Sequence, residues 1–194
     1  MQYFGVFLCF LSNNPELIDR IILTHRNSYG IAALQVIYDG RREVLFIDDY
    51  ILCHNKKPLF SKPVKYSDMW PCLLEKGWFK IKSCLKSKIT SAHPLEVFST
   101  FLSYPLKSYV LTDSVKDNRV IISKYILSGQ NLGRGFGCVI TSKVRPNHKI
   151  GLSGSRPFYF LKALEIKDQL YFYLRNPCGN FDFRGSLHEL PKEL

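Results

Sequence analysis

The sequence predicts an α+β protein with a mostly helical first half followed by an antiparallel β-rich second half. Apolar residues recur at helical spacing in the first half. Asp39-Gly40 separates two apolar runs there, which is the strongest short-range signal of a β-hairpin. After a short helical segment at residues 94–102 the pattern changes to short runs typical of strands, and we place the boundary between the halves near residue 95. We therefore predict two domains, residues 1–95 and residues 96–194.

The first predicted helix covers the apolar residues 3–11. This stretch has the length of the apolar region of a signal peptide, but no Lys or Arg precedes it and residues 12–15 offer no small-x-small cleavage site. It is also too short to span a bilayer, so we interpret it as a buried helix. A second helix begins near Pro15, which suits a first helical turn. It carries four apolar residues at helical spacing: Leu17, Ile18, Ile21 and Ile22.

A hairpin and two further helices complete the first half. Strands are expected over residues 31–38 and 42–47, followed by a loop rich in Lys and Pro over residues 54–66. Trp70-Pro71 then opens a helix, and residues 94–102 form a shorter one. The longer helix carries four apolar side chains on one side: Leu73, Leu74, Trp78 and Ile81.

The second half predicts strands over residues 139–140, 159–163 and 170–174. The last two strands are joined through residues 165–169 and should form another hairpin. The sequence contains no internal repeat and no low-complexity segment.

Composition indicates a folded protein of a reducing compartment. The chain has 194 residues, of which 46% are hydrophobic, and this excludes a disordered protein. Its six cysteines are scattered without a CxxC pair, so we expect no disulfide framework and an intracellular, cytoplasmic location. The net charge of +11 raises nucleic-acid or anionic-membrane binding as a question. Its lysines, including those of residues 80–88, are spread through loops and a helix face, which favours a solvated basic surface.

Two motifs bear on nucleic-acid binding, and neither is complete. Residues 134–141 resemble the RNP1 octamer of RNA-recognition motifs, but Phe136 is the only residue that matches its aromatic positions, since Cys138 and Thr141 take the other two. The glycines at 129, 133, 135 and 137 precede a predicted strand, whereas a dinucleotide loop follows one. The histidines at 54, 93 and 148 lack partners at metal-ligand spacing, which disfavours zinc.

Four ordered segments resemble the protease core of the calpain family of cysteine proteases. The most specific is Trp70-Pro71-Cys72-Leu73-Leu74-Glu75-Lys76-Gly77-Trp78, against the family's Trp-Pro-x-Leu-Leu-Glu-Lys-Ala-Tyr. The others are the hairpin at residues 35–49, the Gly-Cys strand at 137–140 with residues 151–159, and Leu174-Arg175-Asn176-Pro177 with residues 183–185. The Gly-Leu pair at 151 is similar to the branch that includes the fungal PalB proteins. The resemblance implies a papain-like fold whose two domains are the halves of that core, with an active cleft between them.

The resemblance also assigns the catalytic positions. The family's nucleophilic Cys falls on Gln2, its catalytic His falls on Arg156, and its Asn is retained as Asn176. An amide cannot replace the thiolate, and a guanidinium, which stays protonated, cannot act as a general base. The oxyanion-hole Gln would lie before Met1, which suggests a truncated chain. The family's calcium loops match Asp182 and Glu189, but two carboxylates do not make a calcium site, which takes six to eight oxygens.

These residues leave three functional hypotheses. The first is an inactive member of the protease family that binds a protein or peptide partner. The second is an active, calcium-dependent endopeptidase whose nucleophile lies on a segment before this sequence. The third is a basic nucleic-acid-binding module, which the incomplete RNP1 pattern disfavours. No membrane span is expected.

Overall fold

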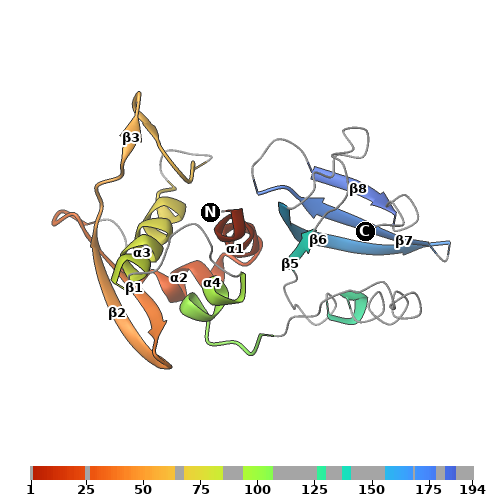
Figure 1. The fold of residues 1–194 in the computed structure, drawn as a ribbon, viewed down its shortest axis with the longest axis horizontal. Helices are drawn as coiled ribbons and strands as arrows, with labels where there is room; N and C mark the ends of the chain where they lie inside the picture. The colour runs from red at the N-terminus through yellow and green to blue at the C-terminus, as the bar shows by residue number, and fades with distance from the viewer. Residues whose placement is uncertain are drawn as a thin grey trace. The chain divides into compact units, whose positions relative to one another are not determined.

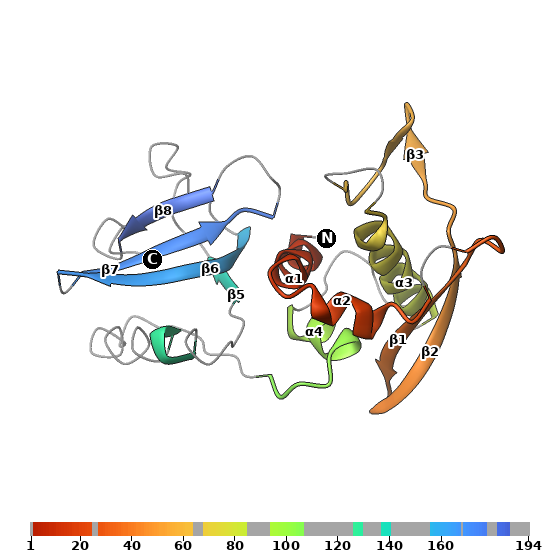
Figure 2. The same cartoon turned by 180° about the vertical axis from the view of Figure 1, so that it is seen from behind.

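The computed structural model of the chain describes residues 2–24, 27–63, 68–84, 94–106, 126–129, 137–140, 156–167, 169–177 and 182–186. The chain divides into two compact units, Tyr3–Lys107 and Ser108–Leu194. Figures 1 and 2 show the helices mainly in the first unit and the longer antiparallel sheet in the second. The structure thus confirms the predicted α+β class.

In the first unit, the described helices lie on one side of a long β-hairpin (Figures 1 and 2). The helices are α1 (Gln2–Ser12), α2 (Glu16–Ile21), α3 (Trp70–Cys84) and α4 (Pro94–Phe101). Strands β1 (Ile31–Tyr38) and β2 (Arg41–Asp48) pair antiparallel, with Ile31 opposite Asp48 and Tyr38 opposite Arg41. The predicted boundary near residue 95 falls within α4, and the division between the units comes after that helix.

The β1–β2 turn has the geometry that its sequence demands. Asp39 and Gly40 have φ angles of 48° and 72°. Positive φ at both central residues is the mark of the two-residue hairpin turn that matches the twist of the flanking strands, and Asp-Gly tolerates it best. The predicted hairpin is therefore confirmed, and its register turns Ala32, Leu34 and Val36 into the core.

Aromatic side chains from three helices form the core of the first unit. Phe4 and Phe7 of α1 meet Trp78 of α3 and Phe101 of α4, with the Phe7 and Phe101 ring centroids 5.3 Å apart. The predicted apolar side of α3 is confirmed, because Leu73, Leu74, Trp78 and Ile81 are all buried. At Gly77 of α3 a Cβ atom would overlap the side chain of Leu34, so this helix can approach β1 closely only without a side chain there.

Two sequence expectations for the first unit are wrong in part. The Lys- and Pro-rich segment is not a plain loop, because β3 (Cys53–His54) and β4 (Lys57–Pro58) pair antiparallel within it. Its turn places Asn55 and Lys56 at φ angles of 49° and 61°. Lys82, expected among solvated lysines, is only 5% exposed. It lies over the ring of Trp78 and pairs with Glu96, so a helical lysine predicted at the surface is part of the core.

The second unit contains a four-stranded antiparallel sheet in the order β5-β6-β7-β8. Its strands are β5 (Gly137–Ile140), β6 (Arg156–Ile166), β7 (Gln169–Arg175) and β8 (Asp182–Ser186). The predicted hairpin between β6 and β7 is confirmed, with Lys167 at its turn and a register shift between Phe160 and Lys162. β8 was not predicted. Phe158, Tyr159, Ala163 and Leu174 are buried.

Candidate functional site

Gln2, the position that the resemblance assigns to the family's nucleophile, is the first residue of a helix, α1. The free N–H groups and the dipole at a helix N-terminus favour a thiolate, which is why a nucleophilic Cys works well there. The local structure at Gln2 is therefore of the kind that the chemistry requires, while the residue type is not.

The strand register brings three other predicted positions to one end of the second unit's sheet. Arg156 begins β6, opposite Ile140 of β5. β7 ends at Arg175, which lies opposite Tyr159 of β6, and Asn176 follows directly. β8 begins at Asp182, opposite Arg175. The ends of adjacent antiparallel strands lie close together, so positions 156, 176 and 182 share this end of the sheet. Asn176 is 5% exposed, and Glu189 lies outside the described residues.

Cys72, the cysteine of the Trp-Pro helix signature, has a deactivated thiol. Cys72 of α3 is buried and donates a hydrogen bond of 3.1 Å to the carbonyl oxygen of Ser61. Burial, and after it the nearby Glu75 and Cys53, raises the pKa of the Cys72 thiol to about 11. The thiol therefore stays protonated near neutral pH and is a poor nucleophile. Cys53 is exposed on β3, and Cys9 is half-buried on α1.

A pocket lies in the first unit between the β3–β4 hairpin and α3. It has a volume of about 400 Å³. Its wall is mostly aromatic and aliphatic: Tyr50, Ile51, Leu52, Pro58, Phe60 and Phe79, with Ser61, Cys72, Glu75 and Lys76 completing it. This is within the size range of pockets that bind ligands or anchor side chains.

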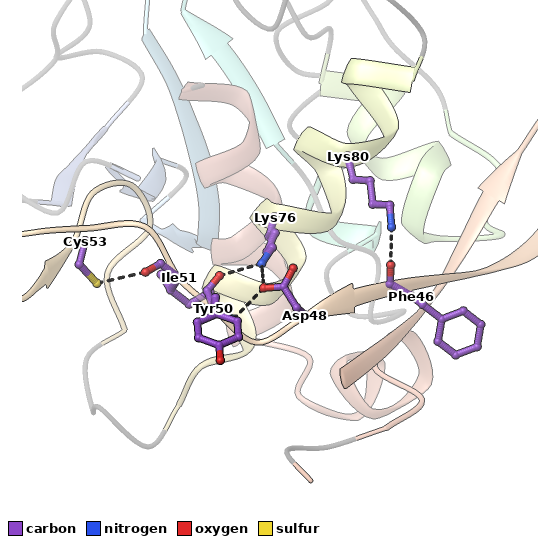
Figure 3. A network of polar contacts seen from close by, with 7 residues as sticks. All are labelled: Phe46, Asp48, Tyr50, Ile51, Cys53, Lys76 and Lys80. Carbon is purple, nitrogen blue, oxygen red and sulfur yellow. Dashed lines mark hydrogen bonds and ion pairs between the residues drawn. The ribbon is translucent and has the colours of Figure 1, made fainter. Parts of the chain in front are cut away.

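Two lysines of α3 fix the strand that leads into this pocket (Figure 3). Lys80 Nζ donates a hydrogen bond of 2.7 Å to the Phe46 carbonyl oxygen on β2. Lys76 Nζ pairs with the Asp48 carboxylate and donates a second bond of 2.7 Å to the Tyr50 carbonyl oxygen. The Tyr50 amide in turn donates to Asp48 Oδ1 at 3.0 Å. Lys76 therefore positions the chain at the point where β2 ends and the pocket wall begins.

The Asp48–Lys76 pair predicts an acid-side loss of stability. The hydrogen bond from Lys76, and after it the Tyr50 amide, holds the pKa of the Asp48 carboxyl below its usual value of 3.8. Since the folded-state pKa is lower than the unfolded one, the stabilisation is complete above about pH 4 and is lost as the pH falls through the folded-state pKa. Carboxyl NMR titration should give Asp48 a midpoint below 3.8. In a Lys76→Met variant the midpoint should rise, and an unchanged midpoint would contradict the assigned cause.

The described residues contain no group of three or more His, Cys, Asp or Glu side chains that could hold a metal ion. Of the two positions matched to the family's calcium loops, Asp182 is among these residues and Glu189 is not. Within the same ranges no helix combines the length and the apolar character needed to cross a membrane.

The sequence prediction missed the pocket. A signal for it was present, because residues 50–63 combine several large apolar residues with three lysines and no Asp or Glu. This composition does not fit a simple solvated loop. The pocket itself depends on packing between the hairpin and α3, which periodicity cannot supply.

Comparison with known proteins identifies the family. A profile described as calpain family cysteine protease matches residues 3–193. The chain is 24% identical over 189 residues to the calpain-1 catalytic subunit of Gallus gallus, covering 91% of this chain and 26% of that protein. It is 22% identical over 191 residues to the calpain-2 catalytic subunit of Gallus gallus, covering 92% of this chain and 27% of that protein. The human calpain-2 catalytic subunit is 23% identical over 187 residues, covering 90% of this chain and 26% of that protein.

The chain therefore belongs to the calpain family of cysteine proteases. It spans about a quarter of the length of the curated relatives that it matches. The resemblance stated from the four ordered segments is confirmed at the level of the family, with the matched region covering almost the whole chain. Helices and antiparallel strands in this order are consistent with an α+β calpain protease domain.

Proposed function

We propose that this calpain-family chain does not cleave peptide bonds and acts by binding a polypeptide. Thiol proteolysis needs a thiolate that attacks the scissile carbonyl and an imidazole that exchanges protons with the thiol and the leaving amine. The positions matched to these groups hold Gln2 and Arg156. Neither side chain can take over the corresponding step, because an amide is not a nucleophile and a guanidinium does not release its proton at cellular pH.

The observation that carries this proposal is Arg156. Its position is supported from both sides: Arg156 begins β6, and Asn176, which matches the family's Asn, follows β7 at the same end of the sheet. In a Cys-His-Asn arrangement the Asn orients the imidazole. Without an imidazole to orient, the buried Asn176 has a structural role only. The surface of the protease core then serves for binding and not for catalysis.

We expect the wild-type chain to leave casein uncleaved, with or without calcium, while binding fluorescein-labelled casein in an anisotropy titration. A peptidyl epoxide that reacts with thiol proteases should label the wild-type chain only slowly, at the exposed Cys53. A Cys53→Ser variant should lose this labelling, because no other thiol is expected to react faster. The physical reason is that none of the matched positions supplies a thiolate–imidazole pair.

The matched control for this test is Arg156→Ala. If wild-type protein showed calcium-stimulated casein cleavage that this variant lost, Arg156 would have a catalytic role and the proposed inactivity would be wrong. Stoichiometric labelling of one cysteine other than Cys53 would contradict it as well. Absence of both cleavage and casein binding would contradict the binding role alone.

A further inference from the structure

The pocket between the β3–β4 hairpin and α3 is well suited to hold a side chain of another polypeptide. We propose that it is an anchor pocket for one large apolar side chain of an acidic peptide segment in a protein partner. The proposal extends the binding role above, but it concerns residues 50–79 and leaves Gln2 and Arg156 out, so either idea can fail without the other.

The interior of the pocket offers few hydrogen-bonding groups to a ligand, because its polar side chains already bond within the protein. Glu75 accepts a hydrogen bond of 2.7 Å from the Ser61 amide, and Cys72 donates to the Ser61 carbonyl oxygen at 3.1 Å. Both residues are buried, with Glu75 6% exposed and Cys72 4% exposed. The rings of Phe60 and Phe79, with centroids 5.2 Å apart, form part of the wall. A polar ligand group buried here would lose its hydrogen bonds to water and find few replacements, whereas an apolar group has no hydrogen bonds to lose.

The rim of the pocket exposes large apolar side chains. Tyr50 is 81% exposed, Leu52 65% and Phe60 47%, and the adjacent Leu59 is also 47% exposed. Clustered exposed apolar residues around a concavity, unlike scattered single ones, mark interaction surfaces. Aromatic side chains beside a pocket that excludes water are also the usual centres of binding energy at protein interfaces.

The charge of the same segment selects an acidic partner. Residues 50–63 contain Lys56, Lys57 and Lys62 and no Asp or Glu. All three lysines are exposed, and none forms an ion pair within the part of the chain that the structure describes. Of the two aspartates that directly precede the segment, Asp48 is already paired with Lys76, and the Asp49 carboxylate lies beside Gly30. The cations are therefore available to carboxylates that flank the anchor side chain, and the attraction between such exposed charges weakens as salt is added.

The arrangement favours a peptide over an anionic membrane surface. The hairpin's turn consists of Asn55 and Lys56, which are polar, while the apolar residues Tyr50, Leu52 and Phe60 lie at its base around a concave pocket. A loop that inserts into a bilayer needs its apolar side chains at the tip, because the tip enters the hydrocarbon region first. A single side chain that projects from a peptide fits a concave pocket directly.

The test uses the full chain and three fluorescein-labelled peptides of twelve residues. The probe has one central tryptophan among glutamates and serines; the first control replaces the tryptophan with alanine, and the second replaces the glutamates with lysines. Anisotropy in 50 mM salt should show binding of the probe, at least tenfold weaker binding of the alanine peptide and no binding of the lysine peptide. No binding of the probe at 1 mM protein, or equal binding of the alanine peptide, would overturn the proposal.

Two variants locate the binding. Leu52→Glu places a charge at the exposed rim and should weaken binding of the probe at least tenfold without changing the thermal melt. Lys56→Glu/Lys57→Glu should weaken it at least fivefold. The charge-matched Arg41→Glu/Arg42→Glu variant, at the far end of β2 from the pocket, should have less than a twofold effect.

Equal effects of the two double variants would overturn the proposal in favour of a diffuse electrostatic attraction. Unchanged binding in Leu52→Glu would also overturn it. Vesicles with 30% phosphatidylserine serve as a final probe: sedimentation of the chain with them, together with no binding of the tryptophan peptide, would assign the hairpin to a membrane surface instead.

Discussion

Replacing Trp78 with Ala should lower the free energy of unfolding by about 4 kcal/mol, the cost typical of removing a fully buried aromatic side chain. Trp78 is 1% exposed at the centre of the first unit. Its ring stacks on Phe4 at 6.2 Å between centroids, lies 6.4 Å from Phe101, and holds Lys82 Nζ 4.9 Å above it. The substitution leaves a cavity among three helices, whose aromatic side chains cannot collapse into it without losing their own contacts.

The matched control is Trp70→Ala on the same helix. Trp70 begins α3 and is only partly buried, so its loss should cost about 1–2 kcal/mol. Urea unfolding followed by far-UV circular dichroism measures both values. Because the chain has two tryptophans, each variant also retains one fluorescent reporter, and Trp78 alone should emit at the shorter wavelength of a buried indole. Equal losses in the two variants would contradict the place given to Trp78 in the core.

Much of the first unit was predictable because its signals are local. The Asp39-Gly40 turn fixes the register of β1 and β2, and that register alone decides which residues face the core. The apolar spacing of Leu74, Trp78 and Ile81 likewise predicts the buried side of α3. These features depend on residues close in sequence, so the sequence contains the information needed to place them.

The features that the sequence did not predict depend on contacts between segments that are distant in sequence. The sequence around Lys82 is that of a solvated lysine, and its burial depends on contacts with Trp78 and with Glu96 of a different helix. The pocket arises where Phe60 meets Phe79, which no periodicity reports. β8 is short, and Gly185 falls inside it, so the strand has little local preference and depends on its pairing with β7. Such features follow from tertiary packing, which overrides local propensity.

The candidate site, like the fold, was predictable only in part. Resemblance to the family names positions 2, 156 and 176, and the strand register brings the last two to one end of the sheet. What resemblance cannot supply is a site that the family's motifs do not encode. The anchor pocket is of this kind, since two of its polar residues, Cys72 and Glu75, belong to the helix signature yet use their side chains to hold Ser61. A motif residue can therefore be structural, while other residues that line the same pocket, such as the exposed Leu52, shape its rim.

The ion pair between Lys82 of α3 and Glu96 of α4 predicts that removing one charge lowers the free energy of unfolding more than removing the other. The side chain of Lys82 is 6% exposed and that of Glu96 is 40% exposed. Removing the negative charge by Glu96→Gln leaves a cation in the core without that carboxylate, and a buried charge without its counter-charge is strongly destabilising. We expect a loss of about 3 kcal/mol in the free energy of unfolding. Lys82→Met keeps most of the packing of the lysine stem and leaves a carboxylate that water can reach, so its loss should be about 1 kcal/mol.

Urea unfolding of the two single variants and the double variant measures this asymmetry. The double variant should resemble Lys82→Met, because without the cation the Glu96 charge has little left to stabilise. Equal losses of unfolding free energy in the two single variants would contradict this prediction. They would mean that water reaches Lys82 as readily as Glu96, and that the two residues form an ordinary surface ion pair.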